Sequence, residues 1–340
     1  MYVGIFSKFS ESEIHSEMVD LIKAFKARSI KPDLLYPNKV SVQLGVPYHN
    51  FTDTKEVPGK IGKPAFKIID SDISNLDKYS GFLIRGGVRS PSFEQRMFRR
   101  NILHTLELFG KKLLNSPKSI EFAADKYLTS AILQANNLPT PRTVVCENIK
   151  NAIKGFYELG ARVVSKPVYG SEGRGLIYLD DIGIAERIFF YLASINSVIY
   201  LQEFVDHPGR DIRVIVLGGE ALCAMYRYSP KNVHSILQRS SNSKKVEKNQ
   251  LPVGIKNWKT NIHAGGKPEY CPLTDEITEL AIKASEALGL ELAGIDLIET
   301  KEGYSILEAN SRPGWQGMMK VQNIDIPKAI VEYFISTLPH

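Results

Sequence analysis

The first 115 residues alternate between short apolar runs and segments with the hydrophobic spacing of helices. Tyr2–Phe6 is an apolar run typical of a buried strand, and Glu13–Ala27 carries apolar side chains every three or four positions. A second strand is predicted at Gly81–Ile84 and a second helix at Phe93–Phe109. Because glycine and proline concentrate between these segments, we expect an α/β arrangement in this part of the chain.

Beyond residue 115 the pattern changes to helices that alternate with strands and hairpins. In chain order we predict helix Ser119–Asn136, strand Arg142–Cys146, helix Lys150–Leu159, strand Ala161–Pro167, strand Leu176–Leu179, helix Ile184–Ala193, strand Val198–Phe204, hairpin Asp211–Leu217 with Glu220–Tyr228, and hairpin Leu292–Ile298 with Ser305–Asn310. Residues 229–250 are polar and show no period, so a long surface loop is expected there.

The last hairpin carries oxygen-bearing side chains on one face. With the turn centred on Glu302, Asp296 lies opposite Glu308, and Asn310 points to the same side because strand side chains repeat every two residues. Facing carboxylates destabilise a sheet unless a cation lies between them, and such oxygens suit Mg²⁺ when phosphates complete its shell. The alternative is a solvated hairpin edge, but the neighbouring residues are apolar or small. We therefore predict a metal site at Asp296, Glu308 and Asn310.

A glycine-rich turn begins just after Lys166, which stands on the apolar strand Ala161–Pro167. Glycines let backbone N–H groups approach phosphate oxygens closely. Because a strand and not a helix follows the turn, it is neither a P-loop nor a dinucleotide fingerprint, and we predict a flap over phosphates. The alternative is an ordinary hairpin tip beside a surface lysine. The predicted phosphate-binding positions in the turn are Gly170, Ser171, Gly173 and Gly175.

Three further segments carry candidates for nucleotide binding. The strand end comprising Gln202, Glu203, Phe204 and Val205 can read adenine through its backbone. Asp211 and Arg213 share a strand face and could hold ribose and phosphate, respectively. Strict pairing puts Arg227 on the opposite face, so it joins them only if a bulge intervenes. The third segment comprises Lys259, Thr260 and Asn261, in which the lysine offers a cation and the asparagine an amide. The preceding residue, Trp258, is expected to lie in the core.

Composition narrows the class of protein. The chain is 43% hydrophobic and has no apolar run of about 18 residues, so no membrane span is expected. The start of the chain lacks the layout of a secretory signal. Three scattered cysteines favour neither disulfides nor zinc and suit a reducing cytoplasm. The net charge of +6 comes without a recognition module for nucleic acid, so we expect no such partner.

Taken in order, six stretches resemble the RimK-like branch of the ATP-grasp superfamily. They are DKYLTSAILQANNLPTPRTVV (125–145), SKPVYGSEGRG (165–175), YLQEFV (200–205), GRDIRVIV (209–216), NWKTNIHAGG (257–266) and AGIDLIETKEGYSILEANSRPGW (293–315). Within that branch, the runs ANNLPTPRTVV, AMYR (224–227) and NWKTN are similar to archaeal tetrahydromethanopterin:glutamate ligases. The chain departs from the pattern in the long 229–250 segment and in Arg312, which stands where a small residue is usual.

This resemblance implies an α+β ATP-grasp fold in three parts. These are an N-terminal α/β domain (1–115), a central lid (116–195) and a C-terminal antiparallel-sheet domain (196–340) that clasps ATP. It implies ATP with two Mg²⁺ or Mn²⁺ ions, and a cytoplasmic protein that is a homo-oligomer by analogy. Its implied ATP-binding residues are Lys126, Lys166, Glu203, Phe204, Asp211, Lys259 and Asn261, and its metal ligands are Asp296, Glu308 and Asn310.

The reaction expected from this resemblance joins a carboxylate to an amine, plausibly that of L-glutamate, through an acyl phosphate. Lys166, Arg213 and Arg227 would counter the developing negative charge. Arginines pair with carboxylates in two-point contacts, so Arg85, Arg89 and Arg312 are candidate substrate clamps, with ordinary surface arginines as the alternative. Rival functions are ligation to a protein tail or carrier through the basic residues 231–248, phosphoryl transfer with a stable product, RNA binding, and an ATP-binding scaffold.

Overall fold

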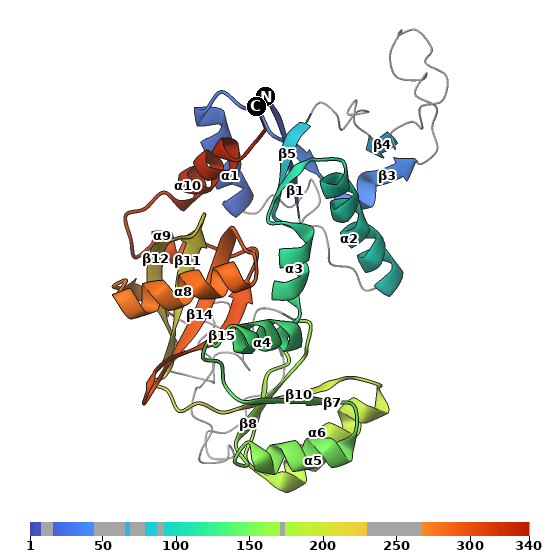
Figure 1. Cartoon of the computed structure of the whole chain (residues 1–340), viewed down its shortest axis with the longest axis vertical. Coiled ribbons are helices and arrows are strands. Elements are labelled where there is room, and N and C mark those ends of the chain that lie inside the picture. The colour runs from blue at the N-terminus through green and yellow to red at the C-terminus, as the bar shows by residue number, and fades with distance from the viewer. Residues whose placement is uncertain are drawn as a thin grey trace, which may run out of the picture. The chain divides into compact units, whose positions relative to one another are not determined.

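A computed structural model describes residues 1–7, 16–43, 65–68, 79–86, 92–170, 174–229 and 267–339 (Figure 1). The chain divides into two compact units. The first comprises Met1–Pro117 and Asp325–His340, and the second comprises Lys118–Ile324. In the described part, no helix is both long enough and apolar enough to cross a lipid bilayer.

The first unit contains a parallel sheet with strand order β2-β1-β5-β6. Its strands are β1 (Tyr2–Phe6), β2 (Asp33–Leu35), β5 (Tyr79–Ile84) and β6 (Lys112–Leu114). Its helices are α1 (Ser16–Ala27), η1 (Pro37–Lys39), α2 (Phe93–Leu108) and α10 (Ile326–Ser336), and β3 (Val40–Gln43) pairs with β4 (Ala65–Ile68). Parallel strands with buried apolar runs confirm the α/β pattern predicted for this part.

The second unit begins with a helix pair and a four-stranded antiparallel sheet, order β7-β10-β8-β9. Its elements are α3 (Pro117–Ala124), α4 (Lys126–Ala135), β7 (Thr143–Cys146), α5 (Ile149–Glu158), β8 (Val163–Lys166), β9 (Ile177–Leu179), α6 (Ile182–Ser194) and β10 (Ile199–Glu203). Helices α5 and α6 lie on one side of this sheet (Figure 1). Alternate strand residues such as Val163 and Leu201 pack against these helices, which leaves the other face for polar side chains.

A five-stranded antiparallel sheet, order β13-β12-β11-β14-β15, completes the second unit. Its elements are β11 (Arg210–Leu217), β12 (Glu220–Tyr228), β13 (Lys267–Cys271), α8 (Asp275–Ala287), β14 (Leu292–Thr300), β15 (Gly303–Asn310) and α9 (Gln316–Met319). One sheet face, including Ile212 and Val214, forms a buried core with α8. Both predicted hairpins are confirmed, and so is the combination of an α/β part with antiparallel sheets.

One predicted helix is wrong, because residues 119–136 do not form a single helix. The chain breaks between α3 and α4 at Asp125, which has extended backbone angles. Its carboxylate accepts a hydrogen bond from the backbone N–H of Leu128 at 2.9 Å and so caps α4. Aspartate favours this capping position over a helix interior, which explains the break.

Residues 325–340 group with Met1–Pro117 in the first compact unit. In α10, Phe334 is fully buried, and its ring meets that of Phe25 in α1 edge-on at a centroid distance of 6.3 Å. The contact buries apolar faces of the first and last helices together, which periodicity alone does not reveal. The division of the chain into lid and C-terminal domains stays a prediction.

Replacing Phe334 by Ala should destabilise the first unit by about 3–5 kcal/mol, because it opens a cavity in a closed core. Hydrogen exchange should quicken in α1, while the amides of α8 in the second unit keep their protection. Phe190→Ala serves as the control, since that ring is 66% exposed in α6. Uniform loss of protection over both units would contradict the grouping of α10 with α1.

Candidate active site

A row of charged side chains crosses the five-stranded sheet on the face opposite α8. Asp211 of β11 lies directly across from Arg227 of β12. Arg213, two residues further along β11, lies across from Asp296 of β14, and Asp296 lies across from Glu308 of β15. The pairing of Asp296 with Glu308 is therefore confirmed. Four neighbouring strands contribute to this row, so its geometry depends on the register of all of them.

Two β-bulges produce that register. In the β11–β12 hairpin the pairing shifts between Ile215 and Val216, and this shift brings Arg227 onto the face of Asp211. In the last hairpin the tight turn pairs Thr300 with Gly303, and a shift between Asp296 and Leu297 restores the pairing with Glu308. The bulge required for Arg227 to join the site is thus present. The predicted centring of the last turn on Glu302 is wrong, and the second bulge compensates for it.

The two aspartates and two arginines of this row, on β11, β12 and β14, form a buried network of ion pairs. Arg227 donates to both carboxylate oxygens of Asp211, at 2.7 and 2.6 Å, and to Asp296 Oδ2 at 2.9 Å. Arg213 binds Asp296 in a two-point contact, with Nη2 donating to Oδ2 at 2.7 Å. Asp211, Arg227 and Asp296 are only 4%, 7% and 4% exposed. Such a network leaves no uncompensated charge inside the sheet.

The pairs keep both kinds of group charged. Burial alone would raise the pKa of Asp296, but Arg213 and Arg227 outweigh it and hold that pKa below its usual value. Burial alone would lower the pKa of Arg227, but the carboxylates of Asp211 and Asp296 outweigh it and raise that pKa. Asp296 is therefore an ionised carboxylate at neutral pH.

The side-chain oxygens of Asp296 and Asn310 fit a metal ion that also takes phosphate oxygens as ligands. An ionised carboxylate offers about four lone-pair positions, and Asp296 uses three of them on arginines, which leaves one on Oδ1. Asn310 donates its amide nitrogen to the carbonyl of Gly294 at 3.4 Å, so its amide oxygen can serve as a ligand. Within the described residues, no group of three His, Cys, Asp or Glu side chains forms a metal site by itself. Phosphate oxygens would have to complete the shell.

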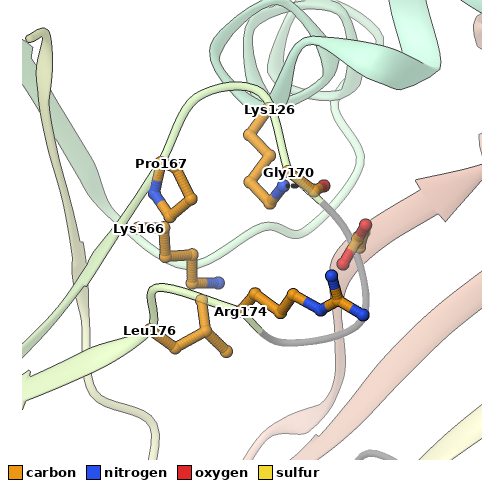
Figure 2. Close-up of a pocket in the computed structure, with 7 residues that line it drawn as sticks. Lys126, Lys166, Pro167, Gly170, Arg174 and Leu176 are labelled. Atoms are coloured by element: carbon orange, nitrogen blue, oxygen red, sulfur yellow. Dashed lines mark hydrogen bonds between the residues drawn. The ribbon is translucent and has the colours of Figure 1, made fainter. Parts of the chain in front are cut away.

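Lys166 of β8 reaches the space next to this row. A pocket within the second unit is lined by Lys126, Lys166, Pro167, Gly170, Arg174, Leu176 and Glu308. Figure 2 shows the side chains of Lys166 and Arg174 extending into the same space, with Lys126 beside Gly170. The pKa of Lys166 is lowered to about 8, mainly by burial; Lys126 acts in the same direction, and Glu308 and Asp296 partly oppose it. Three cations beside one carboxylate suit a polyanion such as a triphosphate.

The glycine-rich turn is anchored at its start to the beginning of α4. Lys126 Nζ donates to the carbonyl of Gly170 at 2.8 Å, and its backbone N–H donates to Val168 at 3.2 Å. Tyr169 donates its hydroxyl proton to Asp125 at 2.8 Å. At the other end, Gly175 has a φ of +77°, a backbone conformation that favours glycine. The phosphate-binding role of the turn stays a prediction.

The strand end predicted to read adenine is flanked by two arginines. The Glu203 carboxylate accepts from the backbone N–H of Arg142 at 2.8 Å and from its Nε at 2.6 Å. The Phe204 N–H donates to the carbonyl of Arg162 at 2.8 Å, and its ring lies 5.1 Å from that guanidinium. Val205 follows directly. The Glu203 carboxylate is thus engaged within the protein, so adenine recognition here would fall to the backbone.

The two predicted substrate clamps that the structure describes belong to different units. Arg85 lies in the first unit at the end of β5, where its buried side chain pairs with Glu17 of α1 at 2.9 Å. Arg312 lies in the second unit, just after β15. Several predicted positions fall outside the described residues, namely Arg89, Ser171, Gly173, Lys259, Thr260 and Asn261. The roles of all these residues stay predictions.

Sequence reasoning missed several residues that shape the pocket. Arg174 lies inside the glycine-rich run but was not singled out as a pocket cation. Asp125 precedes Lys126 and caps α4, a role that its position before a helix could have signalled. Thr143, Tyr200 and Ser130 form a hydrogen-bonded cluster next to Gln202. No sequence signal marks that cluster, because its members come from three separate elements.

Known proteins are similar to this chain in sequence or in fold. The chain matches the RimK-like ATP-grasp domain over residues 123–252 and 253–334. It is 35% identical to tetrahydromethanopterin:alpha-L-glutamate ligase of Methanocaldococcus jannaschii, over 70% of this chain and 75% of that protein. It is 30% identical to the alpha-aminoadipate–LysW ligase LysX of Saccharolobus solfataricus, over 69% of this chain and 81% of that protein. The solved ATP-grasp ligase PsnB, in complex with a phosphomimetic variant of its minimal precursor, Mg and ADP, is similar with a TM-score of 0.69 at 17% identity, over 98% and 97% of the two chains.

The fold of the second unit is that of the ATP-grasp proteins. With relatives named as ligases over most of its length, the chain is an ATP-dependent ligase that joins a carboxylate to an amine. The family match covers more than half of the chain. The chain therefore belongs to the RimK-like ATP-grasp family.

Removing the charge of Asp296 and removing the charge of Glu308 should change the free energy of unfolding by very different amounts. Asp296→Asn should reduce the free energy of unfolding by about 3–5 kcal/mol, because it strips two buried arginines of their shared partner. Glu308 has no ion pair among the described residues, so Glu308→Gln should change stability by less than about 1 kcal/mol while turnover is lost. Urea unfolding of both variants, alongside the assay of phosphate release, tests this contrast. Equal destabilisation would contradict the network.

The charge of Lys166 should govern how ATP affinity varies with pH. Its pKa of about 8 means that the free protein loses this charge as the pH rises above that value. Because phosphates favour the charged form, the dissociation constant for ATP should rise above about pH 8 by up to tenfold per pH unit. Calorimetric titration over pH 7–10 measures it. Lys166→Arg should flatten the profile, since arginine stays charged, whereas exposed Lys154→Arg should not; a persistent slope in Lys166→Arg would contradict the assignment.

Proposed function

We propose that this ligase adds L-glutamate to a carboxylate-bearing coenzyme such as a tetrahydromethanopterin-type pterin, using ATP and Mg²⁺. The observation that carries the proposal is the pocket in which Lys126, Lys166 and Arg174 surround the space beside Glu308. Support for the substrate comes from the Methanocaldococcus jannaschii relative, whose name specifies that reaction. Support for the nucleotide and metal comes from the similar PsnB structure, which contains ADP and Mg.

In the first step, a carboxylate oxygen of the coenzyme attacks the γ-phosphorus of ATP, and ADP leaves. The product is an acyl phosphate. Lys126, Lys166 and Arg174 counter the charge of the phosphate oxygens during this transfer. Arg213 uses Nε and Nη2 on Asp296, so its Nη1 donors remain for the same purpose. These groups are held before ATP arrives, so little reorganisation accompanies the chemical step.

In the second step, the α-amine of glutamate attacks the acyl carbon. A carbon–nitrogen bond forms, inorganic phosphate leaves with the carbon–oxygen bond, and the amine loses a proton. Binding the acidic substrates calls for further cations, for which Arg312, and Arg85 and Arg89 of the first unit, are the candidates. Exclusion of water from the acyl phosphate favours the amide over hydrolysis.

The metal would be held by Asp296, Glu308 and Asn310 together with phosphate oxygens. Mg²⁺ supplies charge neutralisation and fixes the orientation of the phosphates. Asp296 stays ionised through its arginine contacts, and this keeps its remaining lone pair available. The proposal includes two bound metal ions, with Mn²⁺ as the alternative to Mg²⁺.

A second function is supported by the relative from Saccharolobus solfataricus, whose name specifies ligation to the protein LysW. A protein carrier would present an acidic surface or tail. The basic residues 231–248 suit such a partner by charge and lie outside the described residues. Phosphoryl transfer to a stable product is the remaining alternative within ATP chemistry.

Phosphate release with Mg-ATP and L-glutamate, over a panel of pterin, deazaflavin and peptide carboxylates, tests the proposal. We expect release that requires both the pterin carboxylate and glutamate, with the mass gain of one or more glutamyl residues. Glu308→Gln should abolish release, while Glu186→Gln on the exposed side of α6 should retain it. Release without an amine would indicate phosphoryl transfer. ATP binding without release for every small substrate would contradict the coenzyme and favour a protein acceptor.

A further inference from the structure

Lys166 is held in the pocket by a neutral side chain. Lys166 Nζ donates to Oε1 of Gln202 at 2.6 Å. Lys166 pairs with Tyr200 across β8 and β10, and Gln202 lies two residues beyond Tyr200 on the same face. Gln202 is 2% exposed, so its amide must find partners within the protein.

The orientation of the Gln202 amide follows from its partners. An ammonium group has only donors, so the amide oxygen must face Lys166. The amide nitrogen then donates to the Thr143 hydroxyl and to the Tyr200 hydroxyl, each at 3.3 Å. Thr143 in turn donates to the carbonyl of Pro141 at 3.0 Å, which is consistent with its oxygen accepting from Gln202.

The chain of hydrogen bonds continues into α4. The Tyr200 hydroxyl also shares a hydrogen bond with the Ser130 hydroxyl, whose Oγ lies 3.1 Å away. Ser130 lies one helical turn beyond Lys126, the other lysine of the pocket. Reversal of the amide would place an N–H group against the ammonium and leave the two hydroxyls without a donor. The network therefore permits one orientation of Gln202.

A neutral acceptor has a consequence that a carboxylate would not have. A carboxylate at this distance would pair with Lys166 and neutralise it, as Asp296 does for Arg213. The amide takes one of the three ammonium donors, and the others remain for a ligand. The positive charge stays available to an anion in the pocket.

We propose that Gln202 is a positioning residue that aims Lys166 at the phosphates of ATP without neutralising it, with its own amide oriented by Thr143 and Tyr200. This inference rests on the proposed role of Lys166 in the reaction. It assigns Gln202 to the lysine, whereas the strand-end motif alone groups it with the adenine contacts. The network lies wholly within the second unit and involves described residues only.

The test is to compare binding of Mg-ATP and of adenosine by calorimetry. Gln202→Glu keeps the shape and adds a negative charge, so it should weaken ATP binding at least about tenfold, because the new carboxylate competes with the phosphates for the Lys166 ammonium group. Adenosine has no phosphates, and its affinity should change less than about twofold. Gln134→Glu, an exposed site on α4 with the same change of charge, should leave both ligands unaffected.

A second variant keeps the inference testable if Gln202→Glu fails to fold. The double replacement Thr143→Val and Tyr200→Phe adds no charge and removes the acceptors that orient the amide. It should weaken ATP binding by about three- to tenfold while adenosine binding is retained. Urea unfolding of every variant shows whether the fold is preserved.

The outcomes separate this inference from the function on which it rests. If Lys166→Met weakens ATP binding but Gln202→Glu and the double variant do not, Gln202 does not position the lysine. If Gln202→Glu weakens ATP and adenosine equally, its role is structural and the inference is overturned. If Lys166→Met binds ATP as the unmodified protein does, the assigned role of Lys166 fails, and the inference fails with it.

Discussion

The site depends on a buried row of two aspartates and two arginines that joins three strands of the five-stranded sheet. Removing these charges from water is costly, and only their mutual pairing offsets that cost. Each carboxylate of the row contacts an arginine on the neighbouring strand, so a slip of one residue in any pairing would bury an unpaired charge. The row thus couples the register of the sheet to the position of Asp296, the central member of the proposed metal site.

The cationic side chains of the second unit have two different kinds of partner. In the five-stranded sheet, Arg213 and Arg227 pair with carboxylates and keep Asp296 ionised. In the pocket, Lys126 and Lys166 donate to neutral oxygens, a backbone carbonyl and an amide. Compensated charges suit a permanent scaffold. Cations held by neutral partners suit a site that binds a polyanion, because the ligand supplies the missing negative charge.

The last hairpin shows how local pattern and register combine. The apolar and polar pattern is sufficient to predict both strands, and a turn centred on Glu302 predicts the pairing of Asp296 with Glu308. The predicted turn is out of register with the observed one, and a bulge near Leu297 restores the pairing. The opposite case is Arg227, which strict alternation assigns to the wrong face and a bulge turns to the right one. Bulges have weak sequence signals, so pattern alone could state only that a bulge was required.

The sequence by itself determined most of the predicted elements, the two hairpins, the family and the acidic hairpin face, because these follow from local hydrophobic spacing and from short ordered motifs. Tertiary structure alone decided which distant side chains meet. It put Gln202 against Lys166, Arg85 against Glu17, and α10 against α1. Hydrogen bonds and ion pairs act over a few ångströms in space, and strand order and register decide which residues come within that reach.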